Sequence, residues 1–171
     1  ARMNPFIDLA GIEVERNGRP VVSGIELSIA QGTWFGLIGA NGSGKTSLLR
    51  ALAGRLPLAS GSCRINGDEL APDRAARAAL CGFSVPADRL PDALRVRDVL
   101  ELAGGKVEDV CFRLGPLEVA LGLVPLLDLW IGDCSAGMRQ RVAIATAFAG
   151  GHDLVILDEP FNWLDPVAMF D

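Results

Sequence analysis

A glycine-rich segment, residues 39–46, carries the residue types that bind a phosphate chain. Its sequence GANGSGKT fits the pattern G-x-x-x-x-G-K-[ST] at every position. A turn of this kind lets consecutive backbone N–H groups face a polyphosphate, and the positive N-terminus of a following helix adds to the attraction. Lys45 would reach the β- and γ-phosphates, and the Thr46 hydroxyl would ligate Mg²⁺. The segment therefore predicts a site for a nucleoside triphosphate.

Two consecutive acids near the end of the chain could complete a hydrolytic site. Asp158 and Glu159 follow the apolar run 154–157 and precede Pro160. Such a run predicts a buried parallel strand, and α/β sheets bind ligands beyond the carboxyl ends of their strands. Asp158 could hold Mg²⁺, and Glu159 could orient and polarise a water. Alone, this pattern is equally typical of a core strand that ends in a solvated turn, so the phosphate loop upstream is what favours a hydrolytic site.

A third segment, residues 134–141 (CSAGMRQR), predicts a second phosphate receptor. Ser135 is a good N-cap residue, so the turn from Ser135 to Gly137 would present a hydroxyl and free backbone N–H groups at a positive helix end. The chain has one phosphate-cradling loop. A second receptor is therefore useful only if it faces the ATP of another subunit. The alternative interpretation is that Ser135 merely caps a core helix.

Together, these segments resemble the ATP-binding cassette (ABC) ATPase family. Residues 134–141 are similar to the family's Leu-Ser-Gly-Gly-Gln signature, with Cys134, Ala136 and Met138 at the variant positions. Lys45 precedes Ser135 by 90 residues, Ser135 precedes Asp158 by 23, and Asp158 precedes Asp165 by 7, which is the order and spacing of the family. The resemblance also implies further family segments: 142–148 as the signature helix, 158–160 as Walker B and 162–165 as the D-loop.

The resemblance implies a fold, a set of ligands and a set of site residues. The implied fold class is α/β, a P-loop NTPase with a mostly parallel core sheet, a small antiparallel β part and a short helical subdomain. The implied cofactors are ATP and Mg²⁺, with Thr46 and Asp158 on the metal and Glu159 and Lys45 as catalytic residues. The residues expected to bind ATP are Gly39, Asn41, Gly42, Ser43, Gly44, Lys45, Thr46, Ser47, Ser135 and Gly137.

The function that the resemblance implies is ATP hydrolysis coupled to transport across a membrane. In the family, a head-to-tail homodimer or heterodimer sandwiches two ATP molecules and acts on membrane-spanning partner subunits. A location in the cytoplasm, at the inner face of the membrane through the partner, follows from this resemblance. One alternative is a non-transport ABC ATPase of DNA repair, chromosome maintenance or translation, although the long insertions of such proteins are not seen. A small haem-exporter type remains open within the transport class, and a plain P-loop kinase or GTPase would have no reason to keep Ser135.

Hydrophobic patterning indicates the elements that would position these residues. Alternating segments 7–15 and 21–29, separated by the turn 17–20, predict a hairpin. A strand over 34–38 and a helix over 47–53 would flank the phosphate loop, and 60–67 predicts a short strand with a tight turn. Residues from about 96 to 132 carry apolar positions at helical spacing, interrupted by Gly and Pro, and predict a helical subdomain within a single domain, 1–171.

Composition excludes several classes of protein. With 16 basic and 21 acidic residues the net charge is −5, which argues against a nucleic-acid or anionic-lipid binder. No apolar stretch approaches the roughly 18 residues of a spanning helix, so any membrane contact should go through a partner. Arg74 and Arg77, in an alanine-rich segment, predict a solvated helix face. The cysteines lie too far apart for a CxxC metal pair and are expected to be buried thiols: Cys63, Cys81, Cys111 and Cys134.

Three family features are missing from this sequence. The aromatic residue that stacks on adenine is absent, and Asn17, beside Arg16, occupies its place. The Arg16 guanidinium could stack on the base instead, or the turn has no ligand role. The Q-loop glutamine should fall within 83–87, where there is none. Either Asp88 or a water would take its contact, or the signalling that depends on the metal is weakened. The switch histidine should follow the D-loop, yet the sequence ends at Asp171.

His152 is the single histidine, and it is expected to be a loop residue between a helix and a strand. The lack of a histidine after the D-loop favours a fragment or truncation over a chain that folds only with segments supplied elsewhere. We therefore expect these 171 residues alone to bind ATP and to hydrolyse it poorly.

Overall fold

The computed structural model describes residues 5–160, which form two compact units. The first unit ends at Leu80 and the second begins at Cys81. Within the described range, no helix is both long and apolar enough to cross a membrane. Each unit is built around its own group of buried apolar side chains.

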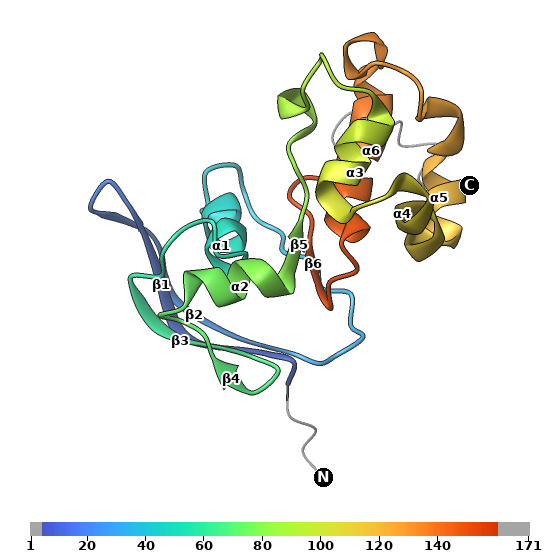
Figure 1. Cartoon of the computed structure of the whole chain (residues 1–171). Coiled ribbons are helices and arrows are strands. Elements are labelled where there is room, and N and C mark those ends of the chain that lie inside the picture. Colours follow the sequence, from blue (N-terminus) through green and yellow to red (C-terminus); the bar gives the residue numbers. More distant parts are fainter. Residues whose placement is uncertain (1–4, 161–171) are drawn as a thin grey trace. The chain divides into compact units, whose positions relative to one another are not determined.

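The first unit opens with the predicted hairpin (Figure 1). Strand β1, Ile7–Arg16, pairs antiparallel with β2, Arg19–Ile29. The connecting turn consists of Asn17 and Gly18, whose φ angles of 54° and 72° are both positive. Asn-Gly is the preferred pair for a two-residue turn of this type, because its twist matches that of the flanking strands. The hairpin prediction is confirmed, and the turn is shorter than the four residues expected.

The residues of strand β1 that face the core are at odd positions in its first half and at even positions in its second half. The buried side chains are those of Ile7 and Leu9, followed by Ile12 and Val14. The step of three residues between Leu9 and Ile12 coincides with an irregularity in the pairing, where Gly11 adopts a φ of 61°. A bulge at this point keeps both apolar pairs on the same face of the sheet.

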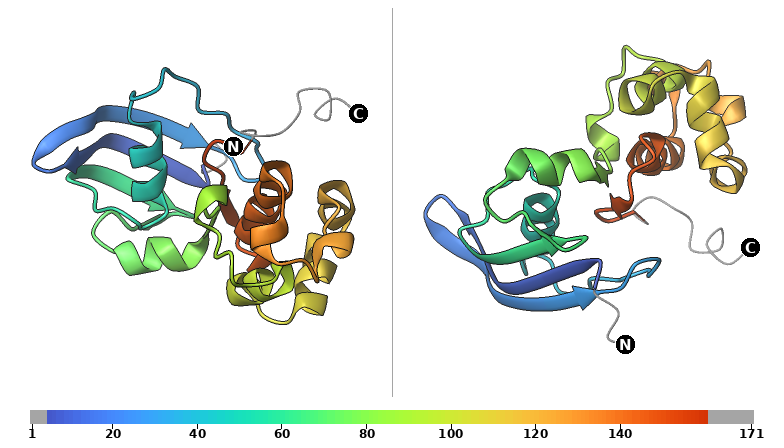
Figure 2. Two further views of the ribbon diagram at one scale, coloured as in Figure 1. Left: turned by 90° about the horizontal axis from the view of Figure 1, so that it is seen from above. Right: turned by 60° about the horizontal axis from the view of Figure 1, so that its bottom comes forward.

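Two further strands complete a four-stranded antiparallel sheet in the order β2-β1-β3-β4. Strand β3, Ser60–Ile65, pairs with β1 and with the short β4, Asp68–Glu69. Helix α1, Lys45–Leu52, and helix α2, Arg74–Leu80, lie together over one face of this sheet (Figures 1 and 2). The predicted strand and tight turn over 60–67 are therefore confirmed.

Arg77 contradicts the expectation of a solvated face on α2, because its side chain is fully buried. Its guanidinium donates to Ala51 O at 3.0 Å, at the end of α1, and to Leu56 O at 3.4 Å. It also donates to Leu70 O and Ala71 O, both at 2.5 Å. A guanidinium has five N–H donors, so it can satisfy several carbonyls that would otherwise be buried without a partner. Arg74, one turn earlier, does lie exposed.

Replacement of Arg77 by Met is expected to destabilise the protein by about 3 kcal/mol, because several buried carbonyls lose their donor. This corresponds to a fall of roughly 6–12 °C in the melting temperature, measured by circular dichroism. Arg74→Met is the matched control, since it removes an exposed guanidinium from the same helix. We expect this control to change stability by less than about 0.5 kcal/mol. Equal losses in the two variants would contradict the role assigned to Arg77.

The second unit contains a parallel pair of strands, β5, Cys81–Phe83, and β6, Leu154–Ile156. Helix α6, Ala136–Ala149, packs beside them. Gly82 makes this packing possible, because any side chain at its position would collide with the carbonyl of Ala147. The predicted strand over 154–157 is confirmed for its first three residues.

The segment between these strands is helical, as its periodicity predicts. It contains α3, Val96–Gly104, α4, Val107–Leu114, and α5, Pro116–Leu121, all of which pack on α6 or on one another. Short 3-10 turns follow at Val124–Leu126 and Ile131–Asp133. Their common core includes Val96, Leu100, Val110, Leu123, Ile131 and Val142.

The prediction of a strand over residues 34–38 is wrong, because the structure has no strand there. Residues 33–40 are assigned to no helix or strand, and the side chains of Trp34 and Ile38 are 88% and 96% exposed. A strand forms only beside a neighbour that takes up its backbone hydrogen bonds. Within residues 5–160, no strand is paired with this segment, so its apolar sequence alone does not make it a strand.

The cysteines are free thiols, as expected from their spacing. Cys63, Cys81 and Cys134 are buried, whereas Cys111 is half-buried. Burial raises the pKa of the Cys63, Cys111 and Cys134 thiols above the usual value, so these stay protonated and unreactive at neutral pH. No cluster of His, Cys, Asp or Glu suited to a metal ion occurs in the part of the chain that the structure describes.

Candidate functional site

The phosphate loop, residues 39–46, belongs to the first unit and leads directly into α1. Gly44 is the N-cap of α1, with a φ of 92°. A Cβ atom at this position would lie 2.5 Å from Val21 O and 2.7 Å from Val22 Cγ2. Gly42 also has a positive φ, of 81°. Two of the loop's glycines are therefore required by backbone conformation, and Gly44 also by the close approach of β2.

Lys45 folds back over the loop that precedes it. Its Nζ donates to Ala40 O at 2.8 Å, to Ser43 Oγ at 3.4 Å and to Gly39 O. Ser43 N in turn donates to Ala40 O at 3.1 Å, which closes the turn. An ammonium group and the N-terminus of a helix thus lie at one exposed loop, an arrangement that attracts a polyphosphate. Thr46 and Ser47 follow in the first turn of α1, and Ser47 is buried.

The two acids lie in the second unit, directly after β6. Because β5 and β6 are parallel, Ser84, after β5, lies beside the residues that follow β6. Ser84 N donates to Ile156 O at 3.1 Å, and Asp158 N donates to Ser84 Oγ at 3.2 Å. Asp158 is half-buried and Glu159 is exposed. Ser84 was not singled out from the sequence, because the strand that it follows, β5, was not predicted.

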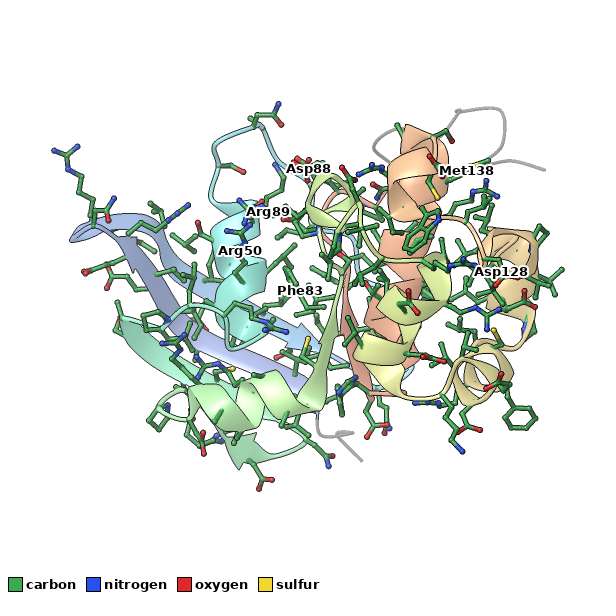
Figure 3. All side chains as sticks on the ribbon, turned by 45° about the horizontal axis from the view of Figure 1, so that its top comes forward. Arg50, Phe83, Asp88, Arg89, Asp128 and Met138 are labelled. Atoms are coloured by element: carbon green, nitrogen blue, oxygen red, sulfur yellow. The ribbon has the colours of Figure 1, made fainter. Side chains whose placement is uncertain are left out.

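Ser135 is the N-cap of α6, as predicted. Its Oγ accepts a hydrogen bond from Met138 N at 3.2 Å. The backbone N–H groups of Ala136 and Gly137 belong to the first turn of a 14-residue helix, where N–H groups lack partners within the helix. Figure 3 shows Met138 on the same turn. This helix end has the chemistry of an anion receptor, with a hydroxyl and N–H groups at a positive dipole.

Arg139, in the same segment, forms an ion pair with Asp92, with 2.5 Å between Nη2 and Oδ1. Asp92 lies in the loop before α3 and its carbonyl also accepts a hydrogen bond from Gly132 N at 3.2 Å. The start of α6 is thereby tied to the loop before α3. These contacts fix the turn around Ser135 from one side.

The positions at which the sequence departs from the family pattern are mostly exposed. Arg16 ends β1 beside Asn17, at the open tip of the hairpin. Asp88 lies on a 3-10 turn, η1, Ala87–Arg89, and is exposed (Figure 3). His152 is in the loop between α6 and β6, as expected, and its Nδ1 is buried. The predicted D-loop, 162–165, lies outside the residues described.

Each of the two residues expected to bind Mg²⁺ has the oxygen chemistry that this ion prefers. The Thr46 hydroxyl and the Asp158 carboxylate are hard oxygen ligands, of the kind that Mg²⁺ takes together with phosphate oxygens and water. Thr46 lies in the first unit and Asp158 in the second. Each lies at an edge where a sheet or helix of an α/β protein binds its ligand: Thr46 at a helix N-terminus and Asp158 after a parallel strand.

Residues 22–162 match the family model described as ABC transporter. Among similar proteins, the Nod factor export ATP-binding protein I of Rhizobium meliloti is 34% identical over 172 residues, which cover 95% of this chain and 50% of that protein. The cytochrome c biogenesis ATP-binding export protein CcmA of Aromatoleum aromaticum is 36% identical over 176 residues, covering 99% of this chain and 81% of that protein. The chain thus spans about half the length of the Nod factor relative.

A solved structure supports the same relationship at the level of the fold. The structure titled "Structure of ATP binding subunit of ABC transporter" has a TM-score of 0.79 and 27% sequence identity to this chain. It covers 96% of this chain, which in turn covers 70% of it. The α/β fold of a P-loop NTPase, expected from the sequence, is therefore confirmed.

Proposed function

Because the chain belongs to the ABC transporter family, we propose that it binds Mg-ATP and, in the complete protein, hydrolyses it to drive export across a membrane. The observation that carries this proposal is the phosphate loop, in which Gly44 is sterically required and Lys45 lies over the turn. Relatives named as export ATP-binding proteins support transport rather than DNA repair or translation. We propose that both units belong to one nucleotide-binding domain, with residues 96–132 as its helical subdomain.

In this proposal, residues of the phosphate loop and of the turn after β6 have different roles in hydrolysis. Lys45 and the loop amides hold the β- and γ-phosphates and offset the negative charge that develops as the bond breaks. Glu159 accepts a proton from the attacking water and orients it, a role suited to its exposed carboxylate. Thr46 and Asp158 would hold Mg²⁺, which neutralises phosphate charge when bound. Gly39, Asn41, Gly42, Ser43 and Ser47 complete the phosphate contacts.

We further propose that two copies, or this chain and a related subunit, close around two ATP molecules. Ser135 and Gly137 would contact the γ-phosphate held by the other copy, since the N-cap geometry of Ser135 leaves a hydroxyl hydrogen and helix N–H groups for an anion. Closure would act on a membrane-spanning partner, which places the protein at the cytoplasmic face of the membrane. The CcmA relative, of which the chain covers 81%, favours a small haem-exporter type within this class.

Mixing two inactive variants tests the shared site. In a dimer of one Lys45→Met copy and one Ser135→Arg copy, one composite site carries both changes and the other carries neither. Mixing the two variants should therefore restore about a quarter of the wild-type ATPase rate, because half of the dimers are mixed and each has one intact site. Each variant alone should be inactive. A mixture that stays inactive, while wild type hydrolyses ATP, would contradict the sandwich.

A further inference from the structure

Gln140 is one of the few buried polar side chains in the second unit, with 6% of its surface exposed. It lies on α6, and its Nε2 donates to Pro160 O at 2.9 Å and to Glu159 O at 3.4 Å. Both partners are carbonyl oxygens, which only accept, so the NH₂ end of the amide must face them. The side chain thus donates its two amide hydrogens to two consecutive carbonyl groups after β6.

We propose that Gln140 is a positioning residue for ATP hydrolysis, which holds the Glu159 carboxylate in place by fixing the backbone that carries it. This inference rests on the proposed function, because it takes Glu159 as the general base. Gln140 does not touch the reacting atoms. It acts through the peptide groups of Glu159 and Pro160.

The conformation of Glu159 explains why this backbone needs support. Its φ angle is 48°, in the left-handed region that residues other than Gly, Asn and Asp rarely adopt. Such a conformation persists only where the surrounding structure imposes it. The amide of Gln140 bonds the carbonyl of this residue and the next, so it opposes relaxation of the turn to a more common conformation. The direction of the Glu159 side chain follows from that turn.

A second contact fixes the same turn from the side of β5. Asp158 N donates to the buried Ser84 Oγ, and Ser84 N donates to Ile156 O. The backbone from Ile156 to Pro160 is therefore held by two buried polar side chains, Ser84 and Gln140. A carboxylate that must place a water within hydrogen-bond distance of a phosphorus atom benefits from such preorganisation.

Helix α6 also carries Ser135, the proposed receptor for the ATP of the other copy. Gln140 follows it by five residues, in the next turns of the same helix. The proposed contact with one ATP molecule, and the support of Glu159, which would activate the water that attacks another, thus lie on one helix and its N-cap. Because Gln140→Met leaves Ser135 and Gly137 unchanged, we expect this variant to keep ATP-dependent dimerisation.

The test compares Gln140→Met with Thr146→Val in the complete protein. Met keeps the length of the side chain without its donors. Thr146 is a second buried polar residue of α6, and its Oγ1 accepts a weak hydrogen bond from Val85 N at 3.4 Å and donates to Ala143 O at 2.6 Å, so neither contact is with Glu159 or Pro160. We expect Gln140→Met to lower kcat about 10- to 100-fold, as misplacement of a reacting group does, with the Kd for Mg-ATP within about threefold of wild type. Thr146→Val should keep kcat within about twofold.

Hydrogen exchange supplies a readout that does not depend on catalysis. In Gln140→Met, the amides of residues 158 and 159 should exchange faster than in wild type, whereas in Thr146→Val they should not. An unchanged kcat in Gln140→Met, or an equal fall in both variants at matched melting temperatures, would overturn the proposal. If the wild-type protein binds ATP without hydrolysing it, the proposed function is wrong and the role of Gln140 fails with it. If the wild-type protein hydrolyses ATP and Gln140→Met does so equally fast, only the role of Gln140 is wrong.

Discussion

Replacement of Glu159 by Gln is expected to lower ATP turnover by about 10²- to 10⁴-fold, the usual contribution of a general base. The amide keeps the size of the side chain but cannot accept the proton of the attacking water. Binding of Mg-ATP should remain within about twofold of wild type, because the phosphate loop and Asp158 are unchanged. Turnover is measured in the complete protein by release of phosphate, and binding by titration with a fluorescent ATP analogue.

A second readout of Glu159→Gln is the oligomeric state. Since ATP is bound but not consumed, the closed dimer should accumulate with Mg-ATP and be visible by light scattering. The matched control is Asp153→Asn, which neutralises an exposed acid just before β6 and should leave turnover unchanged. Full turnover in Glu159→Gln would show that another group activates the water. A variant that stays monomeric with ATP would argue against the sandwich.

Replacement of Lys45 by Met should weaken ATP binding by about 100-fold or more. The ammonium is expected to donate charge-assisted hydrogen bonds to two phosphates, and their loss amounts to about 3 kcal/mol. Lys45 also bonds the carbonyls of Gly39 and Ala40, so the variant also loses contacts that shape the loop itself. The Kd is measured by the same titration.

The matched control for Lys45 is Arg50→Met, which removes a cation from the last turn of the same helix. Arg50 lies outside the phosphate loop, so its replacement should change the Kd for ATP by less than about threefold. Thermal unfolding should separate lost binding from lost folding, because Lys45, at the start of α1, makes only exposed hydrogen bonds to the loop, and its replacement should cost less than about 1 kcal/mol. Equal weakening by both variants would indicate a general electrostatic effect and not a specific contact.

Local sequence predicted the elements that local interactions determine. The Asn17-Gly18 pair specifies its turn with two positive φ angles, and Ser135 specifies the start of α6 through one side-chain hydrogen bond. The conformation of the phosphate loop is likewise determined by its glycines, because only a glycine at position 44 can lie so close to the backbone of Val21. Each of these predictions depends on residues within a few positions of one another, or on a residue type that has no substitute.

Features that depend on distant partners were not predicted. The burial of Arg77 follows from carbonyls on three separate stretches of chain, and nothing in an alanine-rich segment indicates them. Residues 34–38 have the apolar composition of a strand, but composition does not show whether another strand lies beside them to take up their backbone hydrogen bonds. Ser84 and Gln140 reach the backbone around Glu159 from positions 75 and 19 residues earlier (159 − 84 and 159 − 140), so only the fold reveals them.

The pairing of β5 with β6 sets the order in which the second unit can be built. Cys81 is the partner of Leu154, so 73 residues separate the two ends of this contact (154 − 81). Closing a chain segment of that length is entropically costly unless the intervening helices have already compacted it. On the ribosome, β5 therefore waits until β6, which follows α6, has been synthesised, and the turn that carries Glu159 can form only after that.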